Sequence, residues 1–487
     1  MFRILENETV IAFWTLGILN NMPYVVMIAG AKSISEGGTA LVFVSNVLPS
    51  LCIKLSAPYW FDKVSYSRRI SVASLLMSAS FLTVALFGYL ESKRTRYYDD
   101  TGAVEFNFNI FMQLIGVGLC SAQGGLGEAS LLALSGRVDN IVTGQGSDVS
   151  DDSEYDTVDE RRSQIRTEQS SNDRKSLNIA AFSSGTGLAG VCGFLYIFIA
   201  TKIIELSLAE TLVISLIFPF AYWKVYELKL AKYTVADATL INANEQIESS
   251  RDRSGINEMH PLSIEELSDS FLDNPVSSTD DTSVDSNGLN DIISNNSVDI
   301  PNCPISISER ITLTLSLWKY MVPLFVVYAT EYAMQSGIWT AIGFPVDSVS
   351  ARNTFYVASN WMYQLGVFLS RSSGAFFTAP MWMLWLMPLI QTMNLIFFYF
   401  VAMYKIFYNY VLLLPAFFVG LLGGAVYVSG YQRINKDMPL HLREIALSTS
   451  SLADSCGILL ADVSGLFIQA CIYQHHEIDG SLVKCPI

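Results

Sequence analysis

Long apolar runs, separated by shorter polar connections, dominate this chain. A helix crosses the roughly 30 Å hydrocarbon core of a bilayer in about 20 residues. About eleven segments satisfy this requirement, which predicts an all-α polytopic membrane protein. The predicted spans cover about residues 10–31, 40–60, 70–90, 109–135, 177–200, 207–228, 314–342, 355–373, 380–402, 408–432 and 444–472.

Two polar stretches interrupt this pattern. Residues 137–176 and 231–312 are dominated by Ser, Asp, Asn, Glu and Thr, with few aromatic residues. Such segments bury too little apolar surface to offset the entropy lost on ordering, so both are predicted to be disordered loops. The transmembrane helices then fall within 1–136, 177–230 and 313–487, with six spans before the longer loop and five after it. Folds built from two bundles around a midplane site show such a division, although the sequence has no convincing residue-level repeat.

Composition and charge agree with a membrane protein. Of the 487 residues, 51% are hydrophobic and 15% are charged, whereas a soluble protein carries about 25% charged residues. The formal net charge is −15, and it lies entirely in the two loops, with −4 in residues 137–176 and −11 in residues 231–312. This acidic pattern excludes a nucleic-acid-binding protein, which needs a basic surface.

Basic residues near the span ends predict the orientation, because cytoplasmic loops carry an excess of Lys and Arg. The connections on the side of the N-terminus hold most of these residues, and the opposite connections mostly hold one each. The loop containing Lys93, Arg94 and Arg96 is the exception. The N-terminus and both acidic loops are therefore expected in the cytosol, with the C-terminal tail on the other side.

The residues needed for metal, nucleotide or hydrolytic chemistry are not evident. The seven cysteines form no C-x-x-C pair and only four histidines are present, so neither a metal site nor a cofactor is expected. Most cysteines fall in apolar runs and are interpreted as small buried hydrophobic residues. No P-loop occurs, and Asp454 and Asp462 share one predicted helix, which makes a poor protease dyad. An enzyme is the weaker class.

Small residues line one face of the fifth predicted span. Ala181, Gly185, Ala189 and Gly193 recur every four residues. Helices in bilayers associate largely through close packing of such residues, so tight bundle packing is the first interpretation. The alternative is that glycine-rich helices permit the rocking motion of a transporter.

Polar side chains inside the spans carry more information about function. An ionised residue at the bilayer centre costs about 2.5–3.5 kcal/mol, so it persists where it faces water or a partner. For Glu128 and Glu331, cavity or proton-coupling roles are favoured over a static interhelical pair. For the arginines and Glu444, a position at the membrane interface is an equal alternative. The polar residues within the spans are Asn20, Asn21, Gln123, Glu128, Glu331, Gln335, Gln364, Arg371, Arg443, Glu444, Asp454 and Asp462.

Several separated motifs make the sequence recognisable. They are Leu19–Met27, Gly125–Glu128, Ser183–Gly190, Glu331–Tyr332, Gln335–Gly337, Tyr363–Ser373, Gly420–Tyr427, Arg443–Ala446 and Asp454–Gly457. In these motifs, and in their order along the chain, the sequence resembles the battenin family of lysosomal or vacuolar membrane proteins. One departure is the C-terminus, where one residue too few follows Cys485 for a prenylation motif, so a lipid anchor is not expected.

The resemblance implies a major-facilitator-like fold, an endolysosomal or vacuolar membrane location, and a role in lumenal pH and solute homeostasis. It also implies transport of small polar metabolites, since family members are tied to glycerophosphodiesters and to vacuolar basic amino acids. Matching positions add Tyr24, Ser184 and Thr186 to the candidates. The candidate cavity-lining residues are Asn20, Asn21, Tyr24, Gln123, Glu128, Ser184, Thr186, Glu331, Gln335, Gln364, Arg371, Arg443 and Asp454.

These observations favour a secondary carrier in the lipid bilayer, with a small polar solute as its partner and protons as a candidate second partner. Asn20 and Asn21 are expected to face Glu331 and Gln335 across a midplane cavity, where Arg371 would hold an anionic group such as a phosphodiester. Glu128 and Glu331 would compensate charge or take up protons.

The rival hypothesis is a non-transporting membrane scaffold or trafficking regulator. It places the function in the two cytosolic loops, which would bind sorting machinery. Tyr155–Val158 resembles a tyrosine-based sorting signal, although solvated spacer is the favoured interpretation of both loops.

Overall fold

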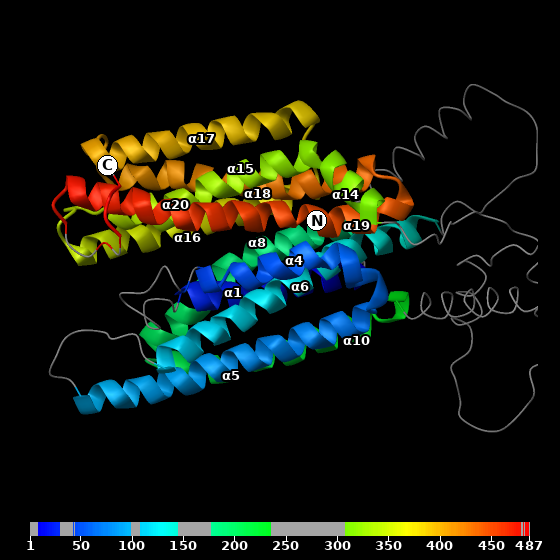
Figure 1. Ribbon diagram of the computed structural model, residues 1–487, viewed down its shortest axis with the longest axis horizontal. Coiled ribbons are helices and arrows are strands. Elements are labelled where there is room, and N and C mark those ends of the chain that lie inside the picture. The colour runs from blue at the N-terminus through cyan, green and yellow to red at the C-terminus, as the bar shows by residue number, and fades with distance from the viewer. Residues whose placement is uncertain are drawn as a thin grey trace, which may run out of the picture.

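The computed structural model describes residues 8–29, 42, 44–98, 108–144, 177–234, 307–478, 481 and 483–486. Within these ranges the regular structure is entirely helical, which confirms the predicted fold class (Figure 1). Most of each acidic loop, including the sorting pattern at 155–158, lies outside the described residues. Helix α6 nevertheless continues to Gly144 and α14 begins at Ile307, so regular structure reaches into both predicted loops.

The helices fall into two groups, one on each side of the longer acidic loop. The first group comprises α1 (Glu8–Ala29), α4 (Leu48–Trp60), α5 (Tyr66–Tyr98), α6 (Phe108–Gly144), α8 (Leu177–Phe198), α9 (Leu208–Ile214) and α10 (Ile217–Lys229). The second comprises α14 (Ile307–Ser316), α15 (Trp318–Ala333), α16 (Val349–Ser373), α17 (Met381–Tyr404), α18 (Leu413–Asp437), α19 (Leu440–Ser450) and α20 (Leu452–His475). In Figure 1 the first group occupies the lower part of the molecule and the second group the upper part.

Each predicted span lies at least partly on helix, but the count of eleven is not confirmed. Eight helical stretches of the described chain are long and apolar enough to cross a membrane. Predicted span 40–60 contains a shorter apolar helix at Leu48–Ala57, and span 314–342 ends in a π-helical turn at Met334–Ile338. Helix α16 is continuous, but it is not among these eight stretches because its polar side chains lower its mean hydropathy.

The two groups repeat each other's packing although the sequence shows no convincing repeat. Helix α1 packs on α8, and α4 on α6; in the second group α15 packs on α20, and α16 on α18. The groups meet where α8 contacts α16 and where α4 contacts α20. When the short helices α14 and α19 are left out of the count, the first helix of each group packs on the fifth and the second packs on the fourth. This repeat supports the predicted two-bundle architecture.

Glycines allow the closest approaches within each bundle. A Cβ at Gly185 would clash with the Trp14 carbonyl oxygen of α1, so the predicted ridge of small residues is a packing face against α1. In the second bundle a Cβ at Gly337 would lie 2.8 Å from the Gly465 carbonyl oxygen. Glycine therefore permits a close approach of α8 to α1, and of the turn that follows α15 to α20.

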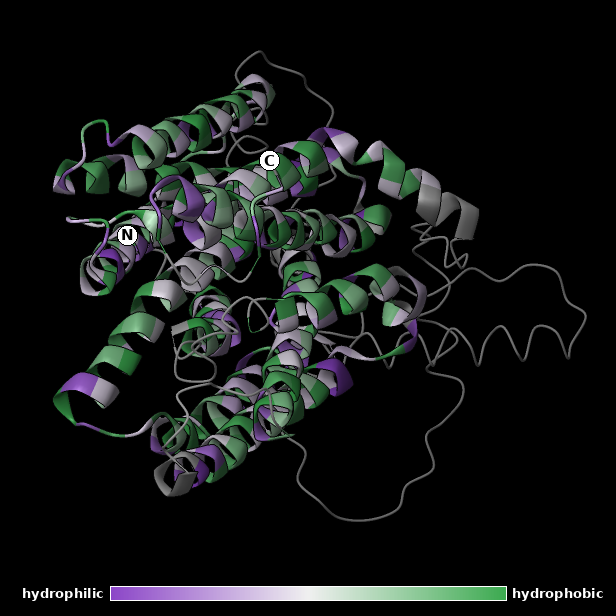
Figure 2. Ribbon diagram, turned by 60° about the vertical axis from the view of Figure 1, so that its left-hand side comes forward, coloured by the Kyte–Doolittle hydropathy of each residue, from purple (hydrophilic) through white to green (hydrophobic). Residues whose placement is uncertain are grey.

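The outer surface is suited to lipid. Figure 2 shows hydrophobic residues recurring along the length of the helices. Large apolar side chains stand exposed on several of them, including Leu75 at 69%, Phe220 at 61% and Leu389 at 65%. A soluble protein rarely exposes contiguous apolar surface on this scale, whereas a bilayer covers it.

Contacts between helix ends identify the two ends of the bundle. Lys229 Nζ lies 3.3 Å from Glu8 Oε2, which places the end of α10 beside the start of α1. At the opposite end the His476 ring nitrogen lies 2.7 Å from the Ala402 carbonyl oxygen. We call these the N-terminal end and the C-terminal end of the bundle.

One cysteine interpretation needs correction. Cys471 and Cys485 form a disulfide that ties the tail back to α20 at the C-terminal end, with 4.7 Å between their Cα atoms. Cys471 is therefore not a lone apolar residue, and Cys485 is not a free thiol. The sequence could not show this pairing, because it depends on the tail reversing direction after α20.

Candidate functional site

A cavity lies between the two bundles, and charged residues from both of them line it. Its empty volume, with the open solvent at its mouth included, is about 690 Å³. Its walls come from α1, α4, α6 and α8 of the first bundle and from α15, α16 and α20 of the second. We call it the charged cavity. Its polar lining residues are Asn20, Asn21, Tyr24, Asn46, Ser50, Lys54, Ser121, Glu128, Thr186, Tyr328, Tyr332, Arg371, Asp454 and Ser455.

A buried lysine bridges the bundles at this cavity. Lys54 Nζ on α4 lies 2.6 Å from Glu128 Oε2 on α6 and 3.0 Å from Asp454 Oδ1 on α20. The side chain of Lys54 is only 2% exposed, whereas that of Glu128 is 19% exposed. Removing one partner of such a pair leaves an uncompensated buried charge, so the three groups depend on one another.

Two tyrosine contacts extend the ion pairs into the second bundle. Tyr427 on α18 donates a hydrogen bond of 2.6 Å to Glu128 Oε1. The guanidinium carbon of Arg371 lies 3.9 Å from the centre of the Tyr427 ring, a cation–π distance. Positive and negative groups therefore alternate from Lys54 to Arg371 across the interface.

Arg371 also binds both bundles directly. Its Nη1 donates to Thr186 Oγ1 on α8 at 2.6 Å, and its Nη2 donates to Tyr328 Oη on α15 at 2.9 Å. Its Nε is buried and has no hydrogen-bond partner among the described residues. Arg371 thus retains a donor for an anionic oxygen, such as that of a phosphate or a carboxylate.

The asparagine pair of α1 is fixed by the neighbouring helices. Asn20 Nδ2 donates to the Gly124 carbonyl oxygen at 3.3 Å, and Gln123 Nε2 donates to Asn20 Oδ1 at 3.0 Å. Asn21 Nδ2 donates to the Thr186 carbonyl oxygen at 3.2 Å. These bonds hold two amides at the cavity wall within the first bundle.

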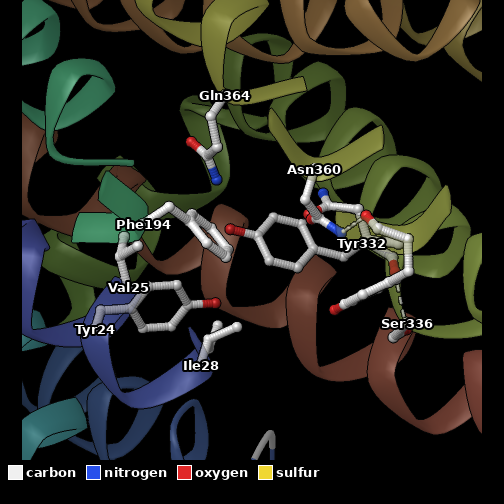
Figure 3. A pocket seen from close by; sticks show the side chains of 10 residues that line it. Tyr24, Val25, Ile28, Phe194, Tyr332, Ser336, Asn360 and Gln364 are labelled. Atoms are coloured by element: carbon white, nitrogen blue, oxygen red, sulfur yellow. Dashed lines mark hydrogen bonds between the residues drawn. The ribbon is translucent and has the colours of Figure 1, made fainter. Parts of the chain in front are cut away.

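A second cavity lies next to the charged one. It is lined by Tyr24, Val25, Ile28, Phe194, Tyr332, Gln335, Ser336, Tyr356, Asn360 and Gln364. None of these described lining residues carries a charge, so we call it the neutral pocket. Tyr24 and Tyr332 line both cavities, and their hydroxyl groups point toward one another in Figure 3. The two tyrosines therefore form the partition between the cavities.

The structure brings many of the predicted residues together. Those at the charged cavity are Asn20, Asn21, Tyr24, Glu128, Thr186, Arg371 and Asp454. Tyr24, Gln335 and Gln364 line the neutral pocket. Gln123 lies behind Asn20, and Ser184 contacts Ser372 across the bundles, with 2.8 Å between their hydroxyl oxygens. Arg443 lies outside both cavities, near the N-terminal end, where its Nη2 donates to the Met438 carbonyl oxygen at 3.1 Å.

Glu331 is not opposite the asparagine pair as expected. Its Oε1 accepts a hydrogen bond of 2.9 Å from Tyr363, and its Oε2 accepts one of 3.4 Å from Gln391. Both partners belong to the second bundle, and Glu331 is among the described lining residues of neither cavity. Gln335, four residues on, does line the neutral pocket, and its Nε2 donates to the Glu331 carbonyl oxygen at 3.5 Å. The carboxylate of Glu331 therefore does not accompany Gln335 to the cavity wall.

Sequence reasoning missed the central cation. Lys54 is a single lysine within an apolar segment. The rule applied to the acidic residues, that a charge inside a span must face water or a partner, would have identified it. Tyr328, Tyr332 and Tyr427 were not among the candidates either, because a tyrosine in an apolar span resembles ordinary core packing. Tyr332 and Tyr427 belong to recognised motifs, but only the tertiary contacts place them at the cavity or its ion pairs.

The arrangement suits binding better than catalysis. Lys54 and Arg371 oppose Glu128 and Asp454, so the cavity presents both signs of charge at short range. No group of three or more His, Cys, Asp or Glu residues that could hold a metal ion occurs in the described ranges. A solute with its own charged groups could exchange with these pairs.

The chain is similar to solved structures of membrane transporters at low scores. The human organic anion transporter MFSD10 (TETRAN) has a TM-score of 0.49 at 12% identity, covering 96% of each chain. A bacterial homologue of the iron transporter ferroportin, in an outward-facing state, has a TM-score of 0.44 at 12% identity, covering 96% of this chain and 94% of that one. Likeness at this level identifies neither ligand nor mechanism.

Sequence relatives are similar along almost their whole length. Protein BTN1 of Yarrowia lipolytica is 28% identical over 474 residues, which cover 96% of this chain and 95% of that protein. Protein BTN1 of Saccharomyces cerevisiae is 26% identical over 482 residues, covering 96% and 95%. The family model described as CLN3 protein matches residues 11–147 and 169–475. The chain therefore belongs to the CLN3, or battenin, family.

Proposed function

We propose that this protein is a secondary carrier of small polar metabolites that bear a charged group, such as glycerophosphodiesters or basic amino acids. The observation that supports it best is the charged cavity, which both bundles line and which holds two cations and two carboxylates. Family membership supports a lysosomal or vacuolar membrane and a contribution to lumenal pH and solute homeostasis. The proposed orientation keeps the N-terminus in the cytosol.

The ion pairs indicate how the cavity could change access. Lys54 and Glu128 belong to the first bundle, whereas Asp454 and Tyr427 belong to the second. Separating the bundles here requires these contacts to break. A charged solute that replaces them offsets the cost of leaving buried charges unpaired, so its binding would be coupled to movement of the bundles.

The recognition of an anionic group is assigned to Arg371. Its guanidinium already spans the bundles, and its buried Nε has no acceptor among the described residues. Guanidinium matches phosphate and carboxylate oxygens in geometry as well as charge, which an ammonium does not. Arg371→Lys should therefore lower uptake relative to the wild type, although it keeps the positive charge.

Uptake into liposomes that contain the purified full chain tests the proposal. The probes are radiolabelled glycerophosphocholine, glycerophosphoethanolamine and lysine. Loss of one charge-assisted hydrogen bond, about 1.5–3 kcal/mol, predicts a fall in uptake of about ten- to a hundredfold for Arg371→Ala. Arg433→Gln, outside both cavities, is the control. Equal uptake by the wild type and Arg371→Ala would contradict the role of Arg371, and no uptake of any probe would contradict the substrate class.

Deletion of the acidic loops distinguishes the carrier from the rival function, a scaffold that acts through the cytosolic loops. Residues 145–172 and 240–300 include none of the described lining residues of either cavity, so their removal leaves those residues in the chain. A carrier should retain uptake of its probe in this variant. A scaffold should lose its cellular effect while the purified protein transports nothing in either form.

A further inference from the structure

Two acidic residues on α20, Asp454 and Asp462, differ in whether their carboxylates have partners. Asp454 has Lys54 at 3.0 Å and the backbone amide of Ser455 at 2.5 Å. Asp462 is 3% exposed, and neither of its carboxylate oxygens has a hydrogen-bond partner in the part of the chain that the structure describes. A buried ionised carboxylate without a partner is costly, and no described residue supplies a cation to Asp462.

Asp462 lies close to the partition between the two cavities. Ile458, one helical turn before it, lines the charged cavity. Asp462 interacts electrostatically with Tyr24 on α1, Tyr332 on α15 and Tyr356 on α16. These three tyrosines line the neutral pocket, and all three are uncharged hydroxyl groups at neutral pH. The titratable groups that face Asp462 therefore include no countercharge among the described residues.

The surroundings suit a proton better than a metal ion. A metal cation in an oxygen site needs several oxygen ligands in one shell. Asp462 provides the one carboxylate here, and no metal-binding group of three or more acidic, His or Cys residues is present in the described ranges. A proton needs one oxygen, and the neutral pocket offers hydroxyl and amide groups that can relay it.

We infer that Asp462 is the proton-binding site of the carrier, reached through the neutral pocket. The inference rests on the proposed function and deepens it, because it names the coupling ion and the group that binds it. A proton that reaches Asp462 binds one carboxylate oxygen, and it leaves as the tyrosine partition rearranges. Glu128 is then left to the ion pairs of the charged cavity, and Glu331 to its bonds inside the second bundle.

Infrared spectroscopy of the full chain in lipid nanodiscs tests the site without a solute. The difference between wild type and Asp462→Asn at neutral pH should contain the C=O stretch of a protonated carboxylic acid. The difference for Asp454→Asn, a matched acid on the same helix, should contain carboxylate bands instead. Asp462→Glu should move the band and not abolish it, which keeps the test decisive if the asparagine variant folds poorly. Carboxylate bands alone in the Asp462→Asn difference would overturn the inference.

A transport measurement then tests coupling. In liposomes with glycerophosphocholine as the probe, the ratio of pH-gradient-driven uptake to solute exchange should fall at least about tenfold in Asp462→Asn. An unchanged ratio would overturn the coupling role. If the wild type moves none of the probes, the proposed function fails, whereas the infrared result still decides whether Asp462 holds a proton.

Discussion

The charged cavity and the neutral pocket share one interface between the bundles but differ in chemistry. At the charged cavity the bundles are joined by ion pairs around Lys54 and by the contacts of Arg371. At the neutral pocket they face each other through tyrosine and amide side chains, with Tyr24 and Tyr332 between the two cavities. Strong contacts therefore concentrate on one side of the partition and weak ones on the other.

The two cavities also lie toward different ends of the bundle. Arg371 lies near the last residues of α16 and Asp454 near the first residues of α20, both toward the N-terminal end. Ile28 of the neutral pocket lies at the end of α1, toward the C-terminal end. If the bundles separate from the C-terminal end, no described ion pair breaks. If they separate from the N-terminal end, the ion pair between Lys54 and Asp454 must break.

The largest effect is expected from removing the bridging cation. Lys54→Ala leaves Glu128 and Asp454 buried without their partner, which should lower the free energy of unfolding by about 3–5 kcal/mol. Detergent-induced unfolding followed by circular dichroism measures it. Lys224→Ala breaks an exposed pair with Glu227 and should cost no more than about 1 kcal/mol. If the two variants lose equal stability, the charged cavity does not hold the bundles together.

A smaller effect is expected at the tyrosine that binds Glu128. Tyr427→Phe removes the donor to Glu128 Oε1 and should lower the free energy of unfolding by about 1.5–3 kcal/mol, as for a hydrogen bond to a charged group. Tyr431, one turn further along α18, has a buried hydroxyl without a hydrogen-bond partner among the described residues. Tyr431→Phe should therefore be close to neutral in the same assay, and the reverse order would contradict the assigned contacts.

The smallest effect is expected in the neutral pocket. Asn360→Ala removes one hydrogen bond of 2.9 Å to the Tyr356 carbonyl oxygen and should cost about 0.5–1.5 kcal/mol. Asn360 and Lys54 share no described partner, so the double variant should equal the sum of the single ones within about 0.5 kcal/mol. A larger deviation would mean that the two cavities are not independent.

The fold was largely readable from the sequence. Apolar runs of span length fall on helices from α1 to α20, and the small residues of α8 pack on α1 as their spacing indicates. The sequence does not show where a span departs from regular α-helical geometry. The turn at Met334–Ile338 lies where α20 packs on this segment, and no local pattern marks its position.

The site was readable in part. Asn20, Glu128, Arg371 and Asp454 were identifiable because a polar group in lipid must have a wet or polar neighbour. The sequence did not show which neighbour each of them has. Glu331, like Glu128, is a charged residue inside a predicted span, yet it accepts its hydrogen bonds from residues of its own bundle.

By itself the sequence determined that this chain is a multi-span helical membrane protein with polar residues placed inside its spans, because hydrophobic length and charge density are local properties. The tertiary structure alone decided which of those residues meet. Lys54 and Asp454 are 400 positions apart, and a buried charge is stabilised only by whatever lies within a few ångströms of it.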